Sequence, residues 1–454
     1  MLMQFLQTLE KGITATSGFL WGYPLVILLF GTHIYLTFRL RFIQRYIGKA
    51  IKLSVTPDTD SRGDVSQFGA LTTALAATIG TGNIIGVGAA IAAGGPGAVF
   101  WMWLTGVFGF ATKYSEAVLA VKYRVTNENG EQAGGPMYVL ARGMKLPWLG
   151  AIFAGLTAIA AFGIGNMVQS NSIADLMGEQ FGIKPVWTGI VLMILTAGVI
   201  LGGIRNIARV CEGLVPFMAI FYVAGCIILL FMHADRIPGS IELILKSAFT
   251  GHAAVGGFLG ATIREAMRMG VARGLFSNES GLGSAPIVAA AARTRNPVRQ
   301  GLVSATGTFW DTVVICLMTG LVIVNSGAWT QHADEGVLTR HAFQDIPYVG
   351  TLVLTISLFT FVFSTILGWS YYGEKAAEYL FGRRVIKPYR WMWVGAVFVG
   401  AVVPKTVWNF ADLANGLMAL PNLVALLALS GVVVAETRKY LWEGDINAVG
   451  DDGE

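Results

Sequence analysis

The residues best suited to chemistry lie in a polar, glycine-rich stretch of an otherwise apolar run. From Thr72 to Ala92 the chain reads TTALAATIGTGNIIGVGAAIA. Four glycines crowd its middle: Gly80, Gly82, Gly86 and Gly88. Each glycine weakens a helix by about 1 kcal/mol relative to alanine. We therefore expect the helix to unwind near Ile79–Asn83, which would free N–H groups for a carboxylate and carbonyls for a cation.

Close helix packing is the alternative interpretation of these glycines. Gly82 and Gly86 have the GxxxG spacing of small residues that let two membrane helices approach each other. However, Thr78, Thr81 and Asn83 add hydroxyl and amide groups to the same stretch. Such groups are tolerated in a membrane mainly where they face a cavity or a ligand. The polar content thus favours a binding site, and packing remains open.

A second polar stripe occurs in the sequence FGIGNMVQSNS. Asn166, Gln169 and Ser170 are three or four residues apart, so they share one face of a helix. Gln169 can both donate and accept hydrogen bonds, which suits an ammonium or a carboxylate. A hydrogen bond between helices explains the glutamine equally well.

A third stripe occurs in TISLFTFVFSTILGWSYYGEK. Ser364 and Thr365 offer adjacent hydroxyl oxygens, which are suitable ligands for Na⁺. Trp369 lies one helical turn further and could form the wall of a small apolar pocket. Hydroxyls in membrane helices also bond to their own backbone, and this alternative stays open.

Long apolar segments must position these groups. Of the 454 residues, 54% are hydrophobic and 13% are charged, whereas soluble domains average about 25% charged residues. The apolar blocks match the roughly 20 residues of one helical crossing, and they lack the alternation of a β-barrel. We predict an all-α membrane protein with about eleven crossings. They are Gly18–Phe38, Ser66–Ala93, Ala98–Val121, Leu149–Leu176, Pro185–Gly203, Val210–Met232, Ala254–Ala272, Leu302–Val324, Gly350–Leu380, Trp391–Val407 and Leu413–Ala435.

The distribution of basic residues predicts the orientation. Basic clusters follow the first, fifth, seventh and ninth crossings, and they contain Arg39, Arg41, Arg45, Lys49, Lys52, Arg62, Arg205, Arg209, Arg293, Arg295, Arg299, Arg383, Arg384, Lys387 and Arg390. The positive-inside rule places these loops in the cytoplasm and the N-terminus outside. The net charge of +5 is spread over short loops, which argues against a nucleic-acid partner.

Charged residues interrupt the seventh crossing. Arg264, Glu265, Arg268 and Arg273 lie beside several glycines, and each charge near the bilayer centre costs at least about 2.5 kcal/mol. We expect a second discontinuous helix here, with the segment FSNESG near the cytoplasmic mouth.

Three other charged residues lie in apolar segments. Lys113 and Glu116 have the spacing of a structural ion pair on one helix. Asp311 has no assigned role, although it could pair with an arginine of the seventh crossing.

The order of crossings predicts two inverted repeats of five helices. If the first crossing is an accessory, the two broken helices occupy corresponding places in the halves, and the binding site lies between them. The predicted parts are residues 1–65 for the accessory helix and linker, 66–233 and 250–437 for the repeats, and 438–454 for a cytoplasmic tail.

Six motifs together resemble one family. They are GGPGAVFWMWLTGVFG (Gly94–Gly109), ALAATIGTGNIIGV (Ala74–Val87), AGGPMY (Ala133–Tyr138), GNMVQSNS (Gly165–Ser172), RGLFSNESGLGSAP (Arg273–Pro286) and STILGWSYYGEK (Ser364–Lys375). The chain closely resembles the alanine or glycine:cation symporter family. The resemblance implies a fold like that of the bacterial leucine transporter with one added N-terminal helix. It also implies uptake of alanine or glycine with Na⁺ or H⁺ across a bacterial-type inner membrane, without a cofactor.

The resemblance also implies the site residues. The substrate neighbours would be Thr78, Gly80, Thr81, Gly82, Asn83, Gln169, Thr365 and Trp369. A Na⁺ site would comprise Ser364 and Thr365 with Thr78 and carbonyls near it. The charged cluster Arg264, Glu265 and Arg268 departs from what the family leads us to expect.

Two other classes of function remain alternatives. A channel or facilitator for small polar solutes can also be lined by glycine breaks and hydroxyls. A hydrolytic enzyme needs a nucleophile beside a base, yet four of the five histidines fall in predicted outer loops and His33 stands alone in the first crossing. We therefore expect a protein that is not an enzyme. The preferred amino acid, the coupling ion and the oligomeric state are not readable from the sequence.

Overall fold

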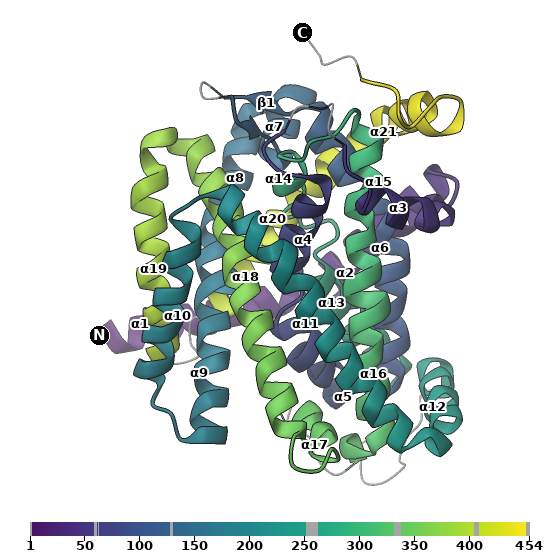
Figure 1. Cartoon of the computed structure of the whole chain (residues 1–454), viewed down its shortest axis with the longest axis vertical. Coiled ribbons are helices and arrows are strands. Elements are labelled where there is room, and N and C mark those ends of the chain that lie inside the picture. The colour runs from purple at the N-terminus through teal and green to yellow at the C-terminus, as the bar shows by residue number, and fades with distance from the viewer. Residues whose placement is uncertain are drawn as a thin grey trace.

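The computed structural model describes residues 2–58, 61, 63–127, 130–250, 262–330, 337–403 and 408–450, and these residues are almost entirely helical (Figure 1). Strands β1 (Val125–Thr126) and β2 (Gln132–Ala133) form an antiparallel pair. The α-helices are α1 (Leu2–Leu20), α2 (Tyr23–Arg39), α3 (Ile47–Ser54), α4 (Gln67–Thr78), α5 (Val87–Gly94), α6 (Gly97–Lys122), α7 (Pro136–Tyr138), α8 (Pro147–Phe162), α9 (Val168–Phe181), α10 (Pro185–Ile200), α11 (Ile204–Met232), α12 (Ile237–Thr250), α13 (Ile263–Asn278), α14 (Pro286–Ala289), α15 (Pro297–Thr308), α16 (Leu317–Ser326), α17 (Leu338–Gln344), α18 (Gly350–Phe381), α19 (Ile386–Val402), α20 (Trp408–Ala428) and α21 (Ser430–Thr437).

Short helical turns of other types join several of these helices. The π-helical turns include η2 (Gly82–Gly86), η4 (Gly163–Met167) and η6 (Phe309–Cys316). Single π-turns are often found at functional sites, because the extra residue widens the helix locally.

The predicted break in the second crossing is confirmed. Helix α4 ends at Thr78, the next residue Ile79 has an extended backbone, and the chain becomes helical again as η2 and α5. The two halves meet at an angle of 56°. Unwinding is limited to about three residues at the start of the predicted segment, because the glycines from Gly82 onward fit a π-turn.

A second break follows α13, and it corrects one prediction. Helix α13 continues to Asn278, six residues beyond the predicted end of the crossing at Ala272, and the chain unwinds before α14. The segment FSNESG therefore lies beside η2 in the middle of the bundle rather than near the mouth, since a Cβ at Gly82 would lie 3.6 Å from Ser277 Cα. Residues 254–261 of the predicted crossing lie outside the described residues.

Long apolar helices support a multi-pass membrane protein. Among the described residues, six helical stretches are long and apolar enough to cross a membrane, and the bent pair α4 and α5 makes a seventh. The other predicted crossings correspond to α6 and α13, which carry charges, and to α10 and α19, which are short. The total of eleven stays a prediction. Besides the broken second crossing, a turn at Trp21 and Gly22 divides the first predicted crossing, and Leu429 divides the last between α20 and α21.

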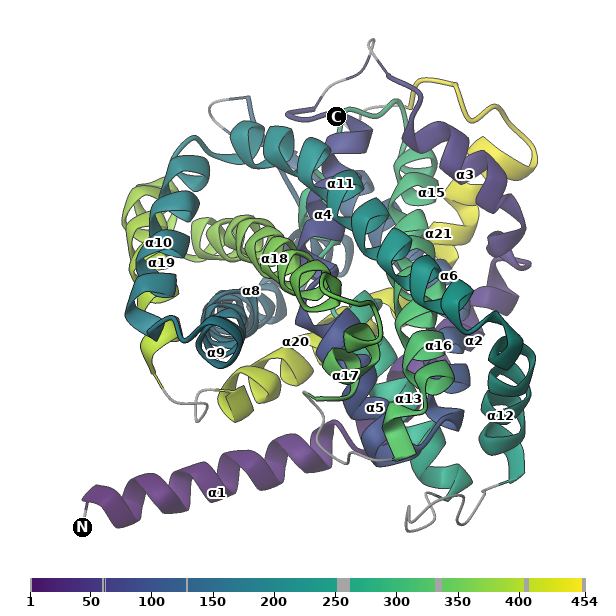
Figure 2. The same cartoon turned by 60° about the horizontal axis from the view of Figure 1, so that its bottom comes forward.

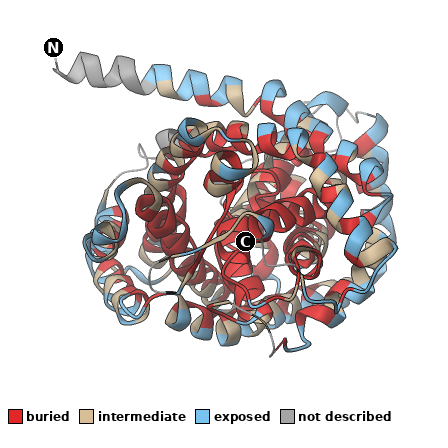
Figure 3. Cartoon of the chain, turned by 90° about the horizontal axis from the view of Figure 1, so that it is seen from above, coloured by how far each residue is buried: buried red, intermediate tan, exposed pale blue. Residues whose placement is uncertain are grey.

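The broken helices lie at the centre of the bundle. Helix α4 packs on α11, α15 and α18, and α13 packs on α5 and α6. Buried residues concentrate there (Figure 3). Large apolar side chains are exposed on the outer helices, as expected for contact with lipid, and they include Trp187, Ile220, Phe231 and Trp391. Helix α1 extends along one side of the bundle (Figure 2).

Candidate functional site

A small cavity of about 20 Å³ lies at the break between α4 and η2. It brings together seven of the eight predicted substrate neighbours: Thr78, Gly80, Thr81, Gly82, Gln169, Thr365 and Trp369. They come from α4, the break at Gly80 and Thr81, η2, α9 and α18. The remaining lining residues, which the sequence did not single out as neighbours, are Ala77, Ile164, Phe276, Ser277, Glu279 and Asn415.

Asn83, the eighth predicted neighbour, turns away from the cavity and supports the break. Its Oδ1 accepts a hydrogen bond from the backbone N–H of Gly80 at 2.9 Å. Its Nδ2 donates to Asp311 Oδ1 at 2.7 Å. The amide therefore anchors the unwound backbone to η6.

Gln169 presents an unused acceptor at the cavity. Its Nε2 donates to the carbonyl of Ile164 at 3.0 Å. Its Oε1 is buried and has no hydrogen-bond partner among the described residues, and a Cβ at Gly80 would lie 3.5 Å from it. A buried acceptor without a partner is costly, so a ligand with N–H donors would stabilise this arrangement.

Hydroxyl and carbonyl oxygens converge where α18 crosses the end of α4. Ser364 Oγ lies 3.3 Å from the carbonyl oxygen of Ala76, and Thr365 Oγ1 lies 3.3 Å from that of Ile79. Both side chains are buried. Thr78 lines the cavity but its hydroxyl donates to Leu75 O within its own helix at 3.3 Å. The four oxygens from Ser364, Thr365 and the two carbonyls are hard donors of the kind that bind Na⁺.

Trp369 closes one side of the cavity and is fixed by the second broken helix. Its Nε1 donates to Glu279 Oε1 at 3.1 Å, and Ser284 Oγ donates to Glu279 Oε2 at 2.5 Å. A Cβ at Gly165 would lie 2.2 Å from Trp369 Cβ, so glycine is required for this close approach. The polar segment FSNESG, which contains Glu279, is visible in the sequence. Its position between the membrane surface and the middle of the bundle depends on where α13 unwinds, and the sequence does not give that residue.

Charged side chains of α6 bind the backbone groups that are exposed at the second break. Lys113 Nζ donates to the carbonyl of Asn278 at the end of α13 at 2.8 Å. Glu116 Oε1 accepts from the N–H groups of Gly281 and Gly283 at 3.1 and 3.0 Å. The predicted ion pair between Lys113 and Glu116 is therefore wrong. A cation at a helix C-terminus and an anion at free N–H groups both stabilise exposed backbone dipoles.

Asp311 connects both breaks. Its carboxylate accepts hydrogen bonds from Asn83 at 2.7 Å, from Ser277 Oγ at 3.0 Å and from Thr312 Oγ1 at 2.7 Å. The prediction that it pairs with an arginine of the seventh crossing is wrong, because these neutral donors surround it. It ties η2, α13 and η6 together.

The electrostatic contrast between the two breaks indicates where a ligand binds. The polar backbone around Glu279–Ala285 is held by Lys113 and Glu116, whereas among the described residues only neutral side chains bind the backbone of the first break. Glu279 also lines the cavity, and its carboxyl oxygens accept from Trp369 and Ser284. The first break can therefore accept the charges of a ligand and its counter-ion.

Comparison with known proteins identifies the family of the chain. The family model of the sodium:alanine symporter family matches residues 6–448. The sodium/alanine symporter AgcS of Methanococcus maripaludis is 51% identical over 440 residues, which cover 94% of this chain and 96% of that protein. An uncharacterized transporter of Haemophilus influenzae is 49% identical, over 98% of this chain and 99% of its own length.

A solved structure shows the fold. The crystal structure of MhsT in complex with L-phenylalanine aligns with a TM-score of 0.61 at 14% identity, covering 84% of this chain and 94% of that one. The all-helical chain thus has a fold of the leucine-transporter class. From its match over nearly the whole length and its identity to AgcS, the chain belongs to the sodium:alanine symporter family.

Proposed function

We propose that the protein takes up alanine or glycine together with Na⁺, through the cavity at the break between α4 and η2. The convergence of Ser364, Thr365 and the carbonyls of Ala76 and Ile79 beside this cavity is the observation that carries the proposal. A sodium-coupled amino-acid symporter is the activity expected of the family.

The polar groups around the cavity suit a small zwitterion; its volume of about 20 Å³ holds roughly one water molecule, so the site must widen to admit an amino acid. The first N–H groups of a helix have no acceptor within it, so those at Thr81 and Gly82 would bind the carboxylate. Gln169 Oε1 would accept from the ammonium. Trp369 and Ile164 line the cavity, and their bulk favours a substrate whose side chain is hydrogen or methyl.

Thr365 couples the two ligands. It lines the cavity and also contributes to the oxygen cluster beside Ala76 and Ile79. A Na⁺ ion bound there would fix the backbone that holds the substrate carboxylate, and the substrate would fix the ion site in return. Each ligand therefore raises the affinity for the other.

The proposed orientation in the membrane follows from the basic loops. The positive-inside rule favours a cytoplasmic C-terminus and an outer N-terminus in a bacterial-type inner membrane. The broken helices α4 with α5 and α13 with α14 support two repeats, residues 66–233 and 250–437, with residues 1–65 as an accessory segment and 438–454 as a cytoplasmic tail.

A thermal-shift screen of amino acids tests the proposal. We expect alanine or glycine to raise the melting temperature of the purified protein only when Na⁺ is present, because a ligand stabilises the state that binds it. Leucine and phenylalanine should not fit the central cavity. A shift in K⁺ or choline buffer equal to that in Na⁺ would reject sodium coupling, and a shift that follows pH alone would indicate protons.

Ser364→Ala provides the matched variant for the screen. The substitution removes one oxygen of the proposed ion site, and the buried methyl group needs no partner. We expect the sodium-dependent part of the shift to disappear while the melting temperature in choline stays unchanged. Retention of the full sodium effect would remove Ser364 from the ion site.

A further inference from the structure

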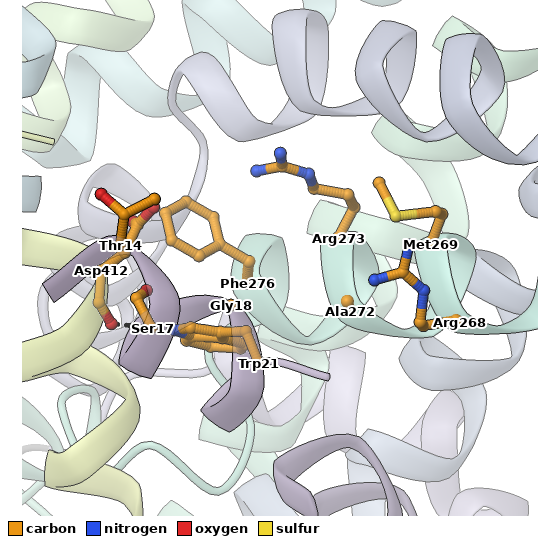
Figure 4. Close-up of a pocket in the computed structure, with 10 residues that line it drawn as sticks. All are labelled: Thr14, Ser17, Gly18, Trp21, Arg268, Met269, Ala272, Arg273, Phe276 and Asp412. Atoms are coloured by element: carbon orange, nitrogen blue, oxygen red, sulfur yellow. Dashed lines mark hydrogen bonds between the residues drawn. The ribbon is translucent and has the colours of Figure 1, made fainter. Parts of the chain in front are cut away.

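The two sides of the central cavity differ in how tightly the protein fills them. On one side, Phe276 lines both the central cavity and a larger one of about 270 Å³ between α1, α13 and α20 (Figure 4). On the other side lies α4, which begins at Gln67 and reaches the cavity at Thr78. Every residue of α4 except Phe68 is buried. A ligand can therefore leave past α4 only if this helix separates from its neighbours.

The far end of α4 is bonded to the loop between α14 and α15. The backbone N–H of Arg293 donates to the carbonyl of Val65 at 2.8 Å. Gln67 donates from Nε2 to Thr294 Oγ1 at 3.0 Å, and its Oε1 accepts from Arg299 Nε at 3.1 Å. At its other end α4 is separated from η2 by unwound backbone, which can serve as a hinge. Movement of α4 about that hinge must break its bonds to the loop.

A C-terminal segment binds the same loop. We call this segment, residues 445–450, the strap. Asn296 Nδ2 donates to two carbonyls of the strap at 2.8 and 2.9 Å, and the N–H of Gly450 donates to the carbonyl of Arg295 at 2.7 Å. The side chain of Ile446 is buried, whereas the three residues that follow it are exposed. The strap is therefore a surface segment that can detach without opening the core.

One guanidinium connects the strap to α4. Arg299 Nη1 donates to Asn447 Oδ1 of the strap at 2.9 Å, while its Nε donates to Gln67. The buried carboxylate of Asp58 fixes the position of this arginine, since Asp58 Oδ2 lies 3.5 Å from Arg299 Nε and Oδ1 lies 2.9 Å from Arg295 Nε. Ion pairs with a buried partner hold a side chain in one geometry. Detachment of the strap would thus loosen the group that holds the start of α4.

We propose that the strap keeps the cytoplasmic side of the central cavity closed, an inference that rests on the proposed site and orientation. The loop that the strap binds is basic, and the positive-inside rule places it in the cytoplasm. While the strap is bound, Asn296 and Arg299 keep the loop and the start of α4 together. When the strap detaches, α4 swings about the break and exposes the cavity to the cytoplasm. The strap therefore sets how often the inner path opens.

Thiol labelling of the full chain in membrane vesicles tests the strap. Thr78→Cys places a reporter at the cavity, and a membrane-impermeant thiol reagent is added on the cytoplasmic side. The three native cysteines are buried, and the chain without the reporter gives their background. Adding Asn296→Asp should raise the labelling rate about 10-fold, because two hydrogen bonds to the strap are lost. The aspartate keeps the oxygen that caps α15 by accepting from Arg299 N at 2.9 Å. Val449→Ala is the matched control within the strap, since its side chain is 69% exposed, and it should leave the rate unchanged.

Labelling from the outer side distinguishes an inner path from general loosening. Asn296→Asp should leave the outer rate unchanged. Asn447→Ala, which removes only one partly exposed hydrogen bond, should raise the inner rate about threefold. Unchanged inner rates in both variants, or equal increases on both sides of the membrane, overturn the role of the strap. The labelling needs neither alanine nor Na⁺. Failure of alanine to bind the wild type would therefore reject the proposed function without altering this result.

Discussion

Gly80→Ala is expected to lower sodium-driven alanine uptake by about 10- to 100-fold, which corresponds to the loss of one hydrogen bond or ligand to a charged group. The added Cβ would lie 2.6 Å from Thr365 Oγ1. The threonine must rotate to relieve this contact, and its hydroxyl then leaves the carbonyl of Ile79. Both the ion site and the substrate cavity lose the residue that they share. Uptake into proteoliposomes measures the effect.

Gly86→Ala is the matched control in the same broken helix. A Cβ at Gly86 meets no atom within 4 Å, so the change should leave uptake near the wild-type rate. Similar uptake by Gly80→Ala and Gly86→Ala would show that the space beside Thr365 is unimportant, and the shared role of Thr365 would be rejected.

Glu116→Ala is expected to destabilise the protein more than other single changes on α6. Glu116 Oε1 accepts from Gly281 N, Gly283 N and, at 2.7 Å, Asn422 Nδ2. Each buried donor left without a partner costs about 1–3 kcal/mol. Gly281 and Gly283 also have positive φ angles, and glycine is conformationally permissive, so the loop depends on these hydrogen bonds to keep its shape. Thermal unfolding in detergent should show a large decrease in melting temperature and loss of alanine binding.

Two further variants, Glu116→Gln and Glu436→Gln, show whether the loss of stability comes from the hydrogen-bond acceptor at position 116 or from the loss of any carboxylate. The glutamine at position 116 keeps one acceptor oxygen and should lose less stability than alanine. Glu436 pairs with Lys122 at a partly exposed position, and such pairs contribute about 0–1 kcal/mol. Equal melting temperatures for Glu116→Ala and Glu436→Gln would contradict the role of Glu116 in holding the second break.

The first break could be predicted from the sequence because its cause is local. Glycines and hydroxyls at adjacent positions weaken the helix wherever it packs, and the structure breaks within Ile79–Asn83. Gln169, Thr365 and Trp369 were found for a similar reason. Polar and aromatic side chains at helical spacing in an apolar run indicate a helix face that is turned toward the protein interior or a ligand.

The second break could not be located because its cause is tertiary. Its unwound backbone is stabilised by Lys113 and Glu116 from α6, and i, i+3 spacing suggested instead that these two residues pair with each other. The segment that contains Phe276, Ser277 and Glu279 was expected near the cytoplasmic mouth. For this reason these three residues were not predicted to line the cavity. Asp311 was equally ambiguous, since its three neutral donors come from three separate parts of the chain.

Concentrative uptake tests the central claim most directly. Proteoliposomes containing the purified protein are prepared with equal alanine inside and outside and with Na⁺ high only outside. The account predicts that labelled alanine accumulates inside until the Na⁺ gradient decays, and that no accumulation occurs with equal Na⁺ on both sides. Accumulation of the same size without a Na⁺ gradient would contradict the account. A flux that only equilibrates alanine and rises linearly with its concentration would also contradict it.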